Sequence, residues 1–86
     1  MNAALSGADL AAELEMFVRA NYHVAAGDEY FTRDVDLWEA GYADSTAVIE
    51  IIAFLEQRLD RLLPESVLFS PRFRSINGIA QLVLEL

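Results

Sequence analysis

Apolar residues recur along the chain with the spacing expected of buried helix faces. From Ala8 to Asn21, the residues at i, i+4, i+7 and i+8 that form one such face are Leu10, Leu14, Phe17 and Val18. Ser6 precedes this stretch and belongs to the residue types favoured as helix N-caps. Asp9 and Glu13 suit the positive end of the helix dipole. The pattern predicts a first helix from about Ala8 to Asn21.

The longest apolar pattern predicts a second helix that begins at Asp44 or Ser45 and ends near Leu62, because Pro64 prevents its continuation. The residues at i, i+4, i+7, i+11 and i+14 are Val48, Ile52, Leu55, Leu59 and Leu62. The apolar residues that broaden this face are Ile49, Ile51 and Phe54. So wide an apolar surface predicts a helix that is buried on more than one side.

Two shorter helical segments are predicted near the end of the sequence. Glu65 to Phe69 can form a single turn that ends at the Ser70-Pro71 pair. Ser75 is placed to cap a last helix, and the apolar face of this helix consists of Ile76, Ile79, Ala80, Val83 and Leu86. Gly78 disfavours this helix by about 1 kcal/mol relative to alanine, so packing must stabilise it.

A long loop separates the first two helices. Gly27 and Asp28 lie where the first helical stretch ends, and a loop of roughly 15–20 residues follows, which is long for a passive connection. We expect Leu37 and Trp38 to anchor this loop to the core. A chain of 86 residues has room for one domain, residues 1–86. The predicted fold class is all-α, a small four-helix bundle of three longer helices and one short helix.

The charge of the chain is acidic and unevenly distributed. The sequence has 14 acidic and 6 basic side chains, which gives a formal net charge of −8. Six acidic residues and no basic residue lie between Asp34 and Glu56, both included. Such a surface repels nucleic acid and anionic membranes and attracts basic protein surfaces. A solvated acidic face that keeps a small protein soluble is the alternative explanation.

The composition also argues against several chemistries. The chain has no cysteine, so disulfides, thiolate metal sites and thiol nucleophiles are excluded. His23 is the only histidine, and a dyad with Ser45 is not expected because no nucleophile elbow surrounds that serine. The acidic residues lack the spacing of a metal site. The segment Met1 to Leu5 has neither a basic start nor a long apolar run, so we expect no signal peptide, no membrane span and a cytoplasmic location.

The Asp44-Ser45 pair at the start of the second helix is the strongest candidate for chemistry. A serine at this position presents its hydroxyl beside the unpaired N–H groups of the first turn, which would stabilise an attached phosphate. Asp44 would repel that phosphate unless it faces away, although it can help to position Mg²⁺ or a basic transferase. The alternative is that one of the two residues serves only as the N-cap.

The surrounding residues form a longer and more specific pattern. Residues 37 to 52 read Leu-Trp-Glu-Ala-Gly-Tyr-Ala-Asp-Ser-Thr-Ala-Val-Ile-Glu-Ile-Ile. This run resembles the prosthetic-group site of the acyl and peptidyl carrier protein family. Its Gly-x-x-Asp-Ser form, made by Gly41, Asp44 and Ser45 and followed by Val-Ile-Glu, is most similar to D-alanyl carrier proteins and related amino-acid carriers. The order of the predicted helices is also similar to that family over the whole chain.

The resemblance implies that Ser45 carries 4′-phosphopantetheine through a phosphodiester, and that Asp44 is part of the motif recognised by a phosphopantetheinyl transferase. The arm would hold an amino-acyl or acyl group as a thioester on a protein that is not itself an enzyme. The other implied partners are an adenylating amino-acid or acyl ligase and a downstream acyl-accepting enzyme. Thr46 departs from the family pattern, which usually has a larger apolar residue there, and this bears on which transferase modifies the chain.

The alternative function is a helical protein–protein interaction module without a prosthetic group, of the death-fold or sterile-motif kind. Such a module would have the same apolar helix faces and could use Asp44 or Ser45 as a cap. It would have no need to combine these two residues with Gly41 and the Val-Ile-Glu continuation.

The charge of the second helix bears on the cargo. The charged residues from Ser45 to Arg61 are Glu50, Glu56, Asp60, Arg58 and Arg61, for a net charge of −1. Fatty-acid carriers typically have a strongly acidic second helix, so the resemblance favours a small amino acid as cargo. We therefore expect the arm to lie on the surface near Ser45 without a deep acyl tunnel. The residues expected to form close-packed core are Val48, Ile49, Ile52, Leu55 and Ile79.

Overall fold

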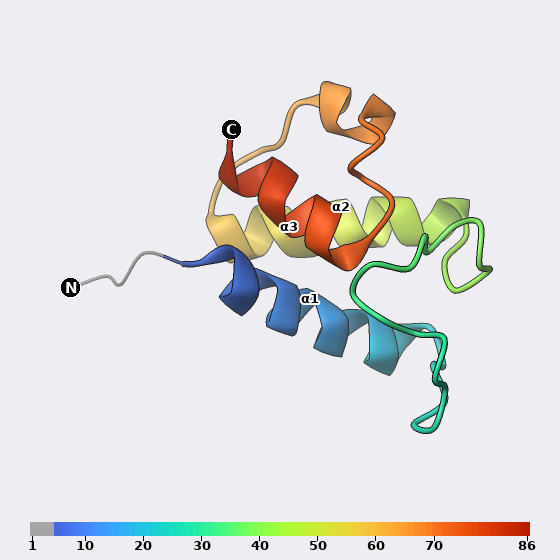
Figure 1. Cartoon of the computed structure of the whole chain (residues 1–86). Coiled ribbons are helices and arrows are strands. Elements are labelled where there is room, and N and C mark those ends of the chain that lie inside the picture. Colours follow the sequence, from blue (N-terminus) through green and yellow to red (C-terminus); the bar gives the residue numbers. More distant parts are fainter. Residues whose placement is uncertain (1–4) are drawn as a thin grey trace.

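The computed structural model describes residues 5–86 and contains four helical elements. These are the α-helices α1 (Gly7–Asn21), α2 (Ser45–Leu59) and α3 (Ile76–Leu84), and the 3-10 helix η1 (Glu65–Phe69) (Figure 1). The described range contains no strand, so the predicted all-α class is confirmed. A four-helix bundle is not confirmed, because the expected short helix is a 3-10 turn of 5 residues.

The segment Met1–Ala4, at which the sequence predicts neither a signal peptide nor a membrane span, lies outside the described residues. Among residues 5–86, no helix is both long enough and apolar enough to cross a bilayer.

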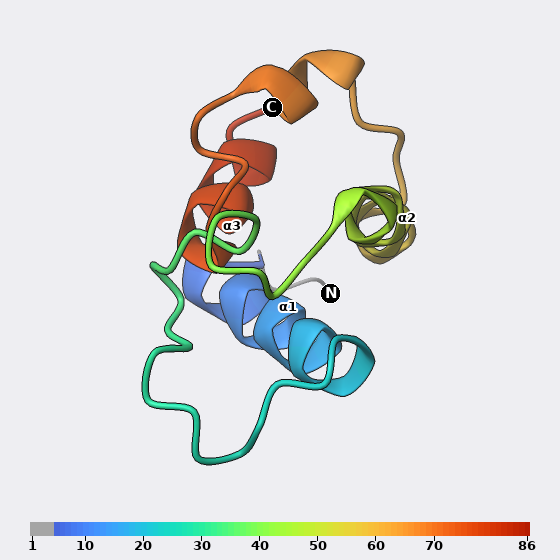
Figure 2. The same cartoon turned by 90° about the vertical axis from the view of Figure 1, so that its right-hand side faces the viewer.

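The two helices α1 and α3 form the central pair of the fold, and α2 lies to one side of that pair (Figure 2). Ser6 caps α1 by accepting a hydrogen bond from the Asp9 N–H at 3.0 Å, and Ser75 caps α3 in the same way through the Gly78 N–H at 3.0 Å. Both predicted caps are therefore confirmed. The fully buried residues of the two helices are Leu10, Leu14, Val18, Ile76, Ile79 and Val83. The prediction for Leu86 is wrong, because Leu86 follows the end of α3 and is 48% exposed.

α2 ends at Leu59, three residues before the predicted end. Asp60 adopts a left-handed backbone conformation with φ of 55°, which stops the helix. The N–H groups of Asp60 and Arg61 both donate to the carbonyl of Glu56. The sequence contains no glycine at this point, and an aspartate in the left-handed conformation is hard to predict.

The burial of α2 also differs from the prediction. Leu55 is fully buried as predicted, but the other fully buried residues are Ala47 and Ile51, each one position before the predicted Val48 and Ile52, which are half-buried. Ile49 is 71% exposed and Leu62 is 84% exposed, so neither belongs to the core. The prediction that α2 is buried on more than one side is therefore wrong. Its outer side faces solvent because α1 and α3 pack mainly against each other.

The loop between α1 and α2 is anchored where the sequence predicts. Leu37 is fully buried, and its N–H donates to the carbonyl of Arg74 at 2.8 Å. Trp38 is half-buried and packs against Phe73, with 6.2 Å between the ring centroids. These contacts tie the loop to the segment that leads into α3.

Phe31 is a second anchor of this loop that the sequence analysis missed. Its side chain is only 5% exposed. The guanidinium of Arg19 lies 4.6 Å from the centre of the Phe31 ring, and the Tyr42 ring meets it edge-on at 5.0 Å. Tyr30 and Phe31 are adjacent aromatic residues in a loop without periodicity, so the sequence does not show that Phe31 is buried and Tyr30 is exposed.

Glu15 connects α1 to the same loop. One of its carboxylate oxygens accepts a hydrogen bond from Arg33 at 2.7 Å, and the other accepts one from Arg19 at 2.8 Å. These two hydrogen bonds, that of Arg33 first, lower the pKa of Glu15 below its usual value of 4.5. The contribution to stability is modest, because the Arg33 side chain is 40% exposed and solvent screens the pair.

The lowered pKa predicts how stability depends on pH. Because Glu15 has a lower pKa in the folded state than in the unfolded state, its contribution is present above the unfolded value of about 4.5 and is lost as the pH falls through the folded value. Glu15→Gln should therefore flatten the fall in the free energy of unfolding on the acid side. Urea unfolding at a series of acidic pH values measures this slope, with Glu29→Gln as the exposed control. Parallel curves for Glu15→Gln and the wild type would contradict the prediction.

Candidate functional site

Ser45 is the first residue of α2, and its side chain is exposed to solvent. The N-cap is Asp44, whose carboxylate accepts a hydrogen bond from the Ala47 N–H at 3.0 Å. This observation resolves the alternative left open by the sequence, in which either residue could be the cap. None of the hydrogen bonds within residues 5–86 uses the Ser45 hydroxyl. The hydroxyl is therefore free for chemistry at the surface.

The first turn of α2 offers hydrogen-bond donors next to this hydroxyl. The backbone N–H groups of Ser45 and Thr46 belong to the helix start and have no intrahelical acceptor. The Asp44 carboxylate is turned back toward the Ala47 N–H, so part of its negative charge is already compensated there. The site thus combines an exposed hydroxyl with N–H groups that favour an anion.

The turn before α2 is shaped by Gly41 and Leu37. Gly41 has φ of 84°, a left-handed conformation that glycine adopts without strain. The carbonyl of Leu37 accepts hydrogen bonds from the N–H groups of Tyr42 and Ala43, both at 3.0 Å. Because Leu37 and Ala43 are buried, this turn holds the Asp44-Ser45 pair in a fixed position relative to the core.

Asp36 supports the same turn and was not identified from the sequence. Its side chain accepts hydrogen bonds from the N–H groups of Trp38 at 3.0 Å and Glu39 at 2.9 Å, and it also pairs with Arg74. The hydrogen bond from the Glu39 N–H is the main cause that lowers the pKa of Asp36. Aspartate side chains in turns often accept a hydrogen bond from the backbone N–H two residues later, and this tendency would have identified Asp36 as a turn residue.

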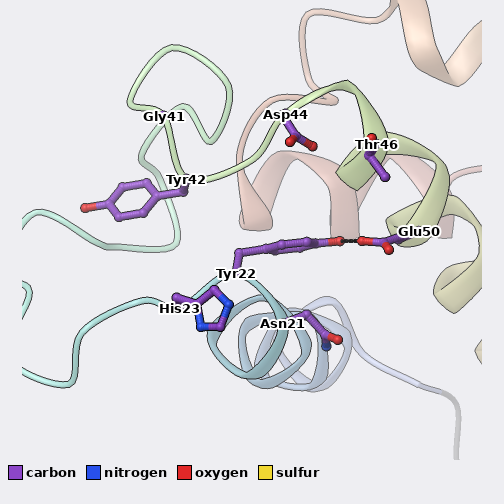
Figure 3. Close-up of a pocket in the computed structure, with 8 residues that line it drawn as sticks. All are labelled: Asn21, Tyr22, His23, Gly41, Tyr42, Asp44, Thr46 and Glu50. Atoms are coloured by element: carbon purple, nitrogen blue, oxygen red, sulfur yellow. Dashed lines mark hydrogen bonds between the residues drawn. The ribbon is translucent and has the colours of Figure 1, made fainter.

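A cleft with a volume of about 390 Å³ opens beside the start of α2 (Figure 3). Its lining residues are Asn21, Tyr22, His23, Gly41, Tyr42, Asp44, Thr46 and Glu50. The Tyr22 hydroxyl donates a hydrogen bond to the Glu50 carboxylate at 2.7 Å, which links the end of α1 to α2. Burial and then Glu50 raise the pKa of Tyr22, so the phenol remains protonated and acts as the donor. Tyr22 and Glu50 are 28 positions apart, so sequence reasoning could not pair them.

The structure does not bring His23 and Ser45 together as a base and a nucleophile. His23 follows α1 in a left-handed conformation with φ of 56° and is exposed. It lines the cleft together with Asp44 and Thr46, whereas Ser45 is not among the lining residues (Figure 3). Within the described part of the chain no hydrogen bond joins the two side chains.

The fold and the site together define a small all-α domain with an exposed serine at the start of a helix. No protein-family model matches this chain, and neither a curated protein nor a solved structure matches it.

Proposed function

We propose that this protein is a carrier that holds an amino-acyl or acyl group as a thioester on a 4′-phosphopantetheine arm attached to Ser45, and that it delivers this group between partner enzymes. The observation that carries the proposal is the division of roles at the start of α2. Asp44 caps the helix, and the exposed Ser45 hydroxyl has no structural role. A serine that served only as a cap would be engaged with the first turn.

The residues around Ser45 fit a group linked by a phosphodiester. The free N–H groups of Ser45 and Thr46 favour a phosphate, and the Asp44 carboxylate is engaged by the Ala47 N–H. Attachment forms a bond from Ser45 Oγ to phosphorus and breaks the bond to the adenosine bisphosphate of coenzyme A, while a base of the transferase takes the hydroxyl proton. When bound, the group supplies the thiol that this chain lacks.

The exposed side of α2 supports docking of partner enzymes beside Ser45. Ile49 lies one turn after Ser45 and is 71% exposed, which places an apolar side chain next to the attachment site. Glu50 and Asp44 add negative charge nearby, which suits a transferase, an adenylating ligase and an acyl-accepting enzyme with basic contact surfaces. The net charge of α2 and the residues just after it is close to zero, which favours few dedicated partners and an amino-acid cargo.

The mass of the intact protein from its native host tests the proposal. A carrier is expected to include a species heavier by one phosphopantetheine group. A protein that occurs only with the mass of its sequence, and that no phosphopantetheinyl transferase modifies with coenzyme A, would instead be the helical interaction module.

The role of Asp44 in recognition gives a further prediction. Asp44→Asn should slow modification several-fold and weaken its dependence on salt, because a charge that steers a basic partner is lost. Asparagine caps helices about as well as aspartate, so the helix start is retained. The measurement is the initial rate of holo-protein formation at low and high ionic strength.

Asp60→Asn is the matched control for this experiment. Asp60 lies at the other end of α2 in a left-handed conformation that asparagine tolerates. The rate of modification should barely change in this variant. Equal effects of the two substitutions would mean that net charge matters and that Asp44 has no specific role.

A further inference from the structure

Three hollows follow one another along α1 and α2, and each shares lining residues with the next. The cleft described above shares Asn21 and Glu50 with a second hollow of about 360 Å³. The second hollow shares Phe54 and Gln57 with a third hollow of about 290 Å³. We call this feature the α1–α2 groove, and the residues that line it in order from Ser45 are Asp44, Glu50, Asn21, Phe17, Phe54 and Gln57.

The groove follows from how α2 is joined to α1. The two helices run in opposite directions (Figure 1), and their side chains form bridges at intervals of about one turn. The bridges are Tyr22 with Glu50, Phe17 stacked on Phe54 with 4.6 Å between centroids, and Glu13 with Arg58. Between these bridges lies Ala53, whose small side chain leaves the middle of the groove open.

We propose that the phosphopantetheine arm on Ser45 lies along the α1–α2 groove. This inference rests on the proposed carrier function and adds a location for the arm. Ser45 itself does not line the groove, but its two neighbours Asp44 and Thr46 do, so the groove opens within reach of an arm bonded to Ser45. The arm needs no separate binding step to reach the groove, because it is covalently attached to Ser45.

The arm is long enough to occupy most of the groove. Gln57 lies 12 residues after Ser45 on the same helix, which corresponds to roughly 18 Å at a rise of about 1.5 Å per residue. The arm from phosphorus to sulfur has about thirteen bonds, equivalent to slightly more than four extended residues or roughly 15 Å. An extended arm would therefore bring its thiol to the level of Phe54, which lies nine residues or roughly 14 Å after Ser45.

The chemistry of the groove also suits this arm, which is uncharged between its phosphate and its thiol. Its geminal methyl groups are attached to the carbon three bonds from phosphorus and stay near Tyr22 and Glu50, whereas the methylene groups next to the thiol can pack on the half-buried rings of Phe17 and Phe54. Its two amides can pair with the side-chain amides of Asn21 and Gln57. Asn21 donates to the carbonyl of Phe17 at 2.8 Å, so its side-chain oxygen remains available as an acceptor. One carboxylate oxygen of Glu50 accepts a hydrogen bond from the Tyr22 hydroxyl, so only the other oxygen faces the arm without a partner of this kind.

Isotope-filtered NMR on the holo protein tests the location of the arm. We expect nuclear Overhauser contacts between the methylene groups next to the thiol of a ¹³C-labelled arm and the ring protons of Phe54. The amide resonances of Asn21 and Gln57 should also shift between the apo and holo forms. Ala53→Trp fills the middle of the groove and should abolish the contacts to Phe54. Ala20→Trp changes an alanine of α1 that is also exposed and lies outside the three hollows, and it should preserve them.

Failure of this inference can be distinguished from failure of the carrier function. Intact mass establishes first whether Ser45 carries the group at all, and a chain that is never modified overturns the carrier proposal. If the holo protein forms but the wild-type arm contacts only residues next to Ser45, the groove proposal is overturned and the carrier proposal stands. The wild-type contacts decide the question even if Ala53→Trp does not fold.

Discussion

Ser45→Ala is expected to abolish incorporation of phosphopantetheine from coenzyme A and to leave the melting temperature essentially unchanged. The loss should be complete because the hydroxyl oxygen is the atom that forms the phosphodiester. Stability should change by less than about 0.5 kcal/mol, since the residue is exposed and Asp44 caps the helix. Mass spectrometry after incubation with a transferase measures the first effect, and thermal unfolding measures the second.

Thr46→Ala is the matched control, because Thr46 is the neighbouring exposed hydroxyl on the first turn. This variant should remain fully modifiable. A holo species of Ser45→Ala would refute the assignment of the attachment site. If Thr46→Ala prevented modification and Ser45→Ala did not, the attachment site would be Thr46.

Gly78→Ala is expected to destabilise the protein by about 1–3 kcal/mol, which is the usual cost of overpacking. Helix propensity alone predicts the opposite sign, because alanine is favoured over glycine by about 1 kcal/mol within a helix. An added Cβ at this position would lie only 2.2 Å from the carbonyl oxygen of Arg72. That carbonyl belongs to the backbone, and Arg72 is held by two hydrogen bonds to Glu85 at 2.6 and 2.7 Å. Urea unfolding measures the change.

Gly7→Ala provides the control for this substitution. Gly7 is the first residue of α1, and nothing lies within 4 Å of a Cβ placed there. Its replacement should leave stability unchanged or raise it slightly through the lower entropy of the unfolded chain. If Gly78→Ala proved as stable as the wild type, the close approach between α3 and the preceding segment would not be rigid.

The helices α1 and α3 could be predicted because each has a single apolar face. Leu10 and Leu14 on α1 are separated by small or polar residues, and on α3 the buried Ile79 and Val83 recur at the helical spacing of four, so the period identifies the buried face of each helix. α2 has apolar residues around most of its circumference, and the period alone could not distinguish Ile51, which is buried, from Ile49, which is exposed. Only the packing of the other two helices decides between them.

The candidate site was predictable only in part, because a local pattern identifies residues without showing which role each of them has. Asp44 and Ser45 were both identified from a local pattern, but both residue types are good caps, so their division of roles needed the backbone geometry. The importance of Gly78 was also hidden, because its close contact with Arg72 depends on tertiary structure. The bridge between Tyr22 and Glu50 depends on how α1 meets α2 and has no local signal.

The separation of cap and hydroxyl at the start of α2 also makes this position suitable for protein engineering. Ser45→Cys would place a thiol on an exposed first-turn residue without removing a structural hydrogen bond. Because the chain has no cysteine, this thiol would be unique in the protein, and a helix N-terminus lowers the pKa of a cysteine. A fluorophore, a spin label or a cross-linker could then be attached selectively where the natural group is proposed to sit.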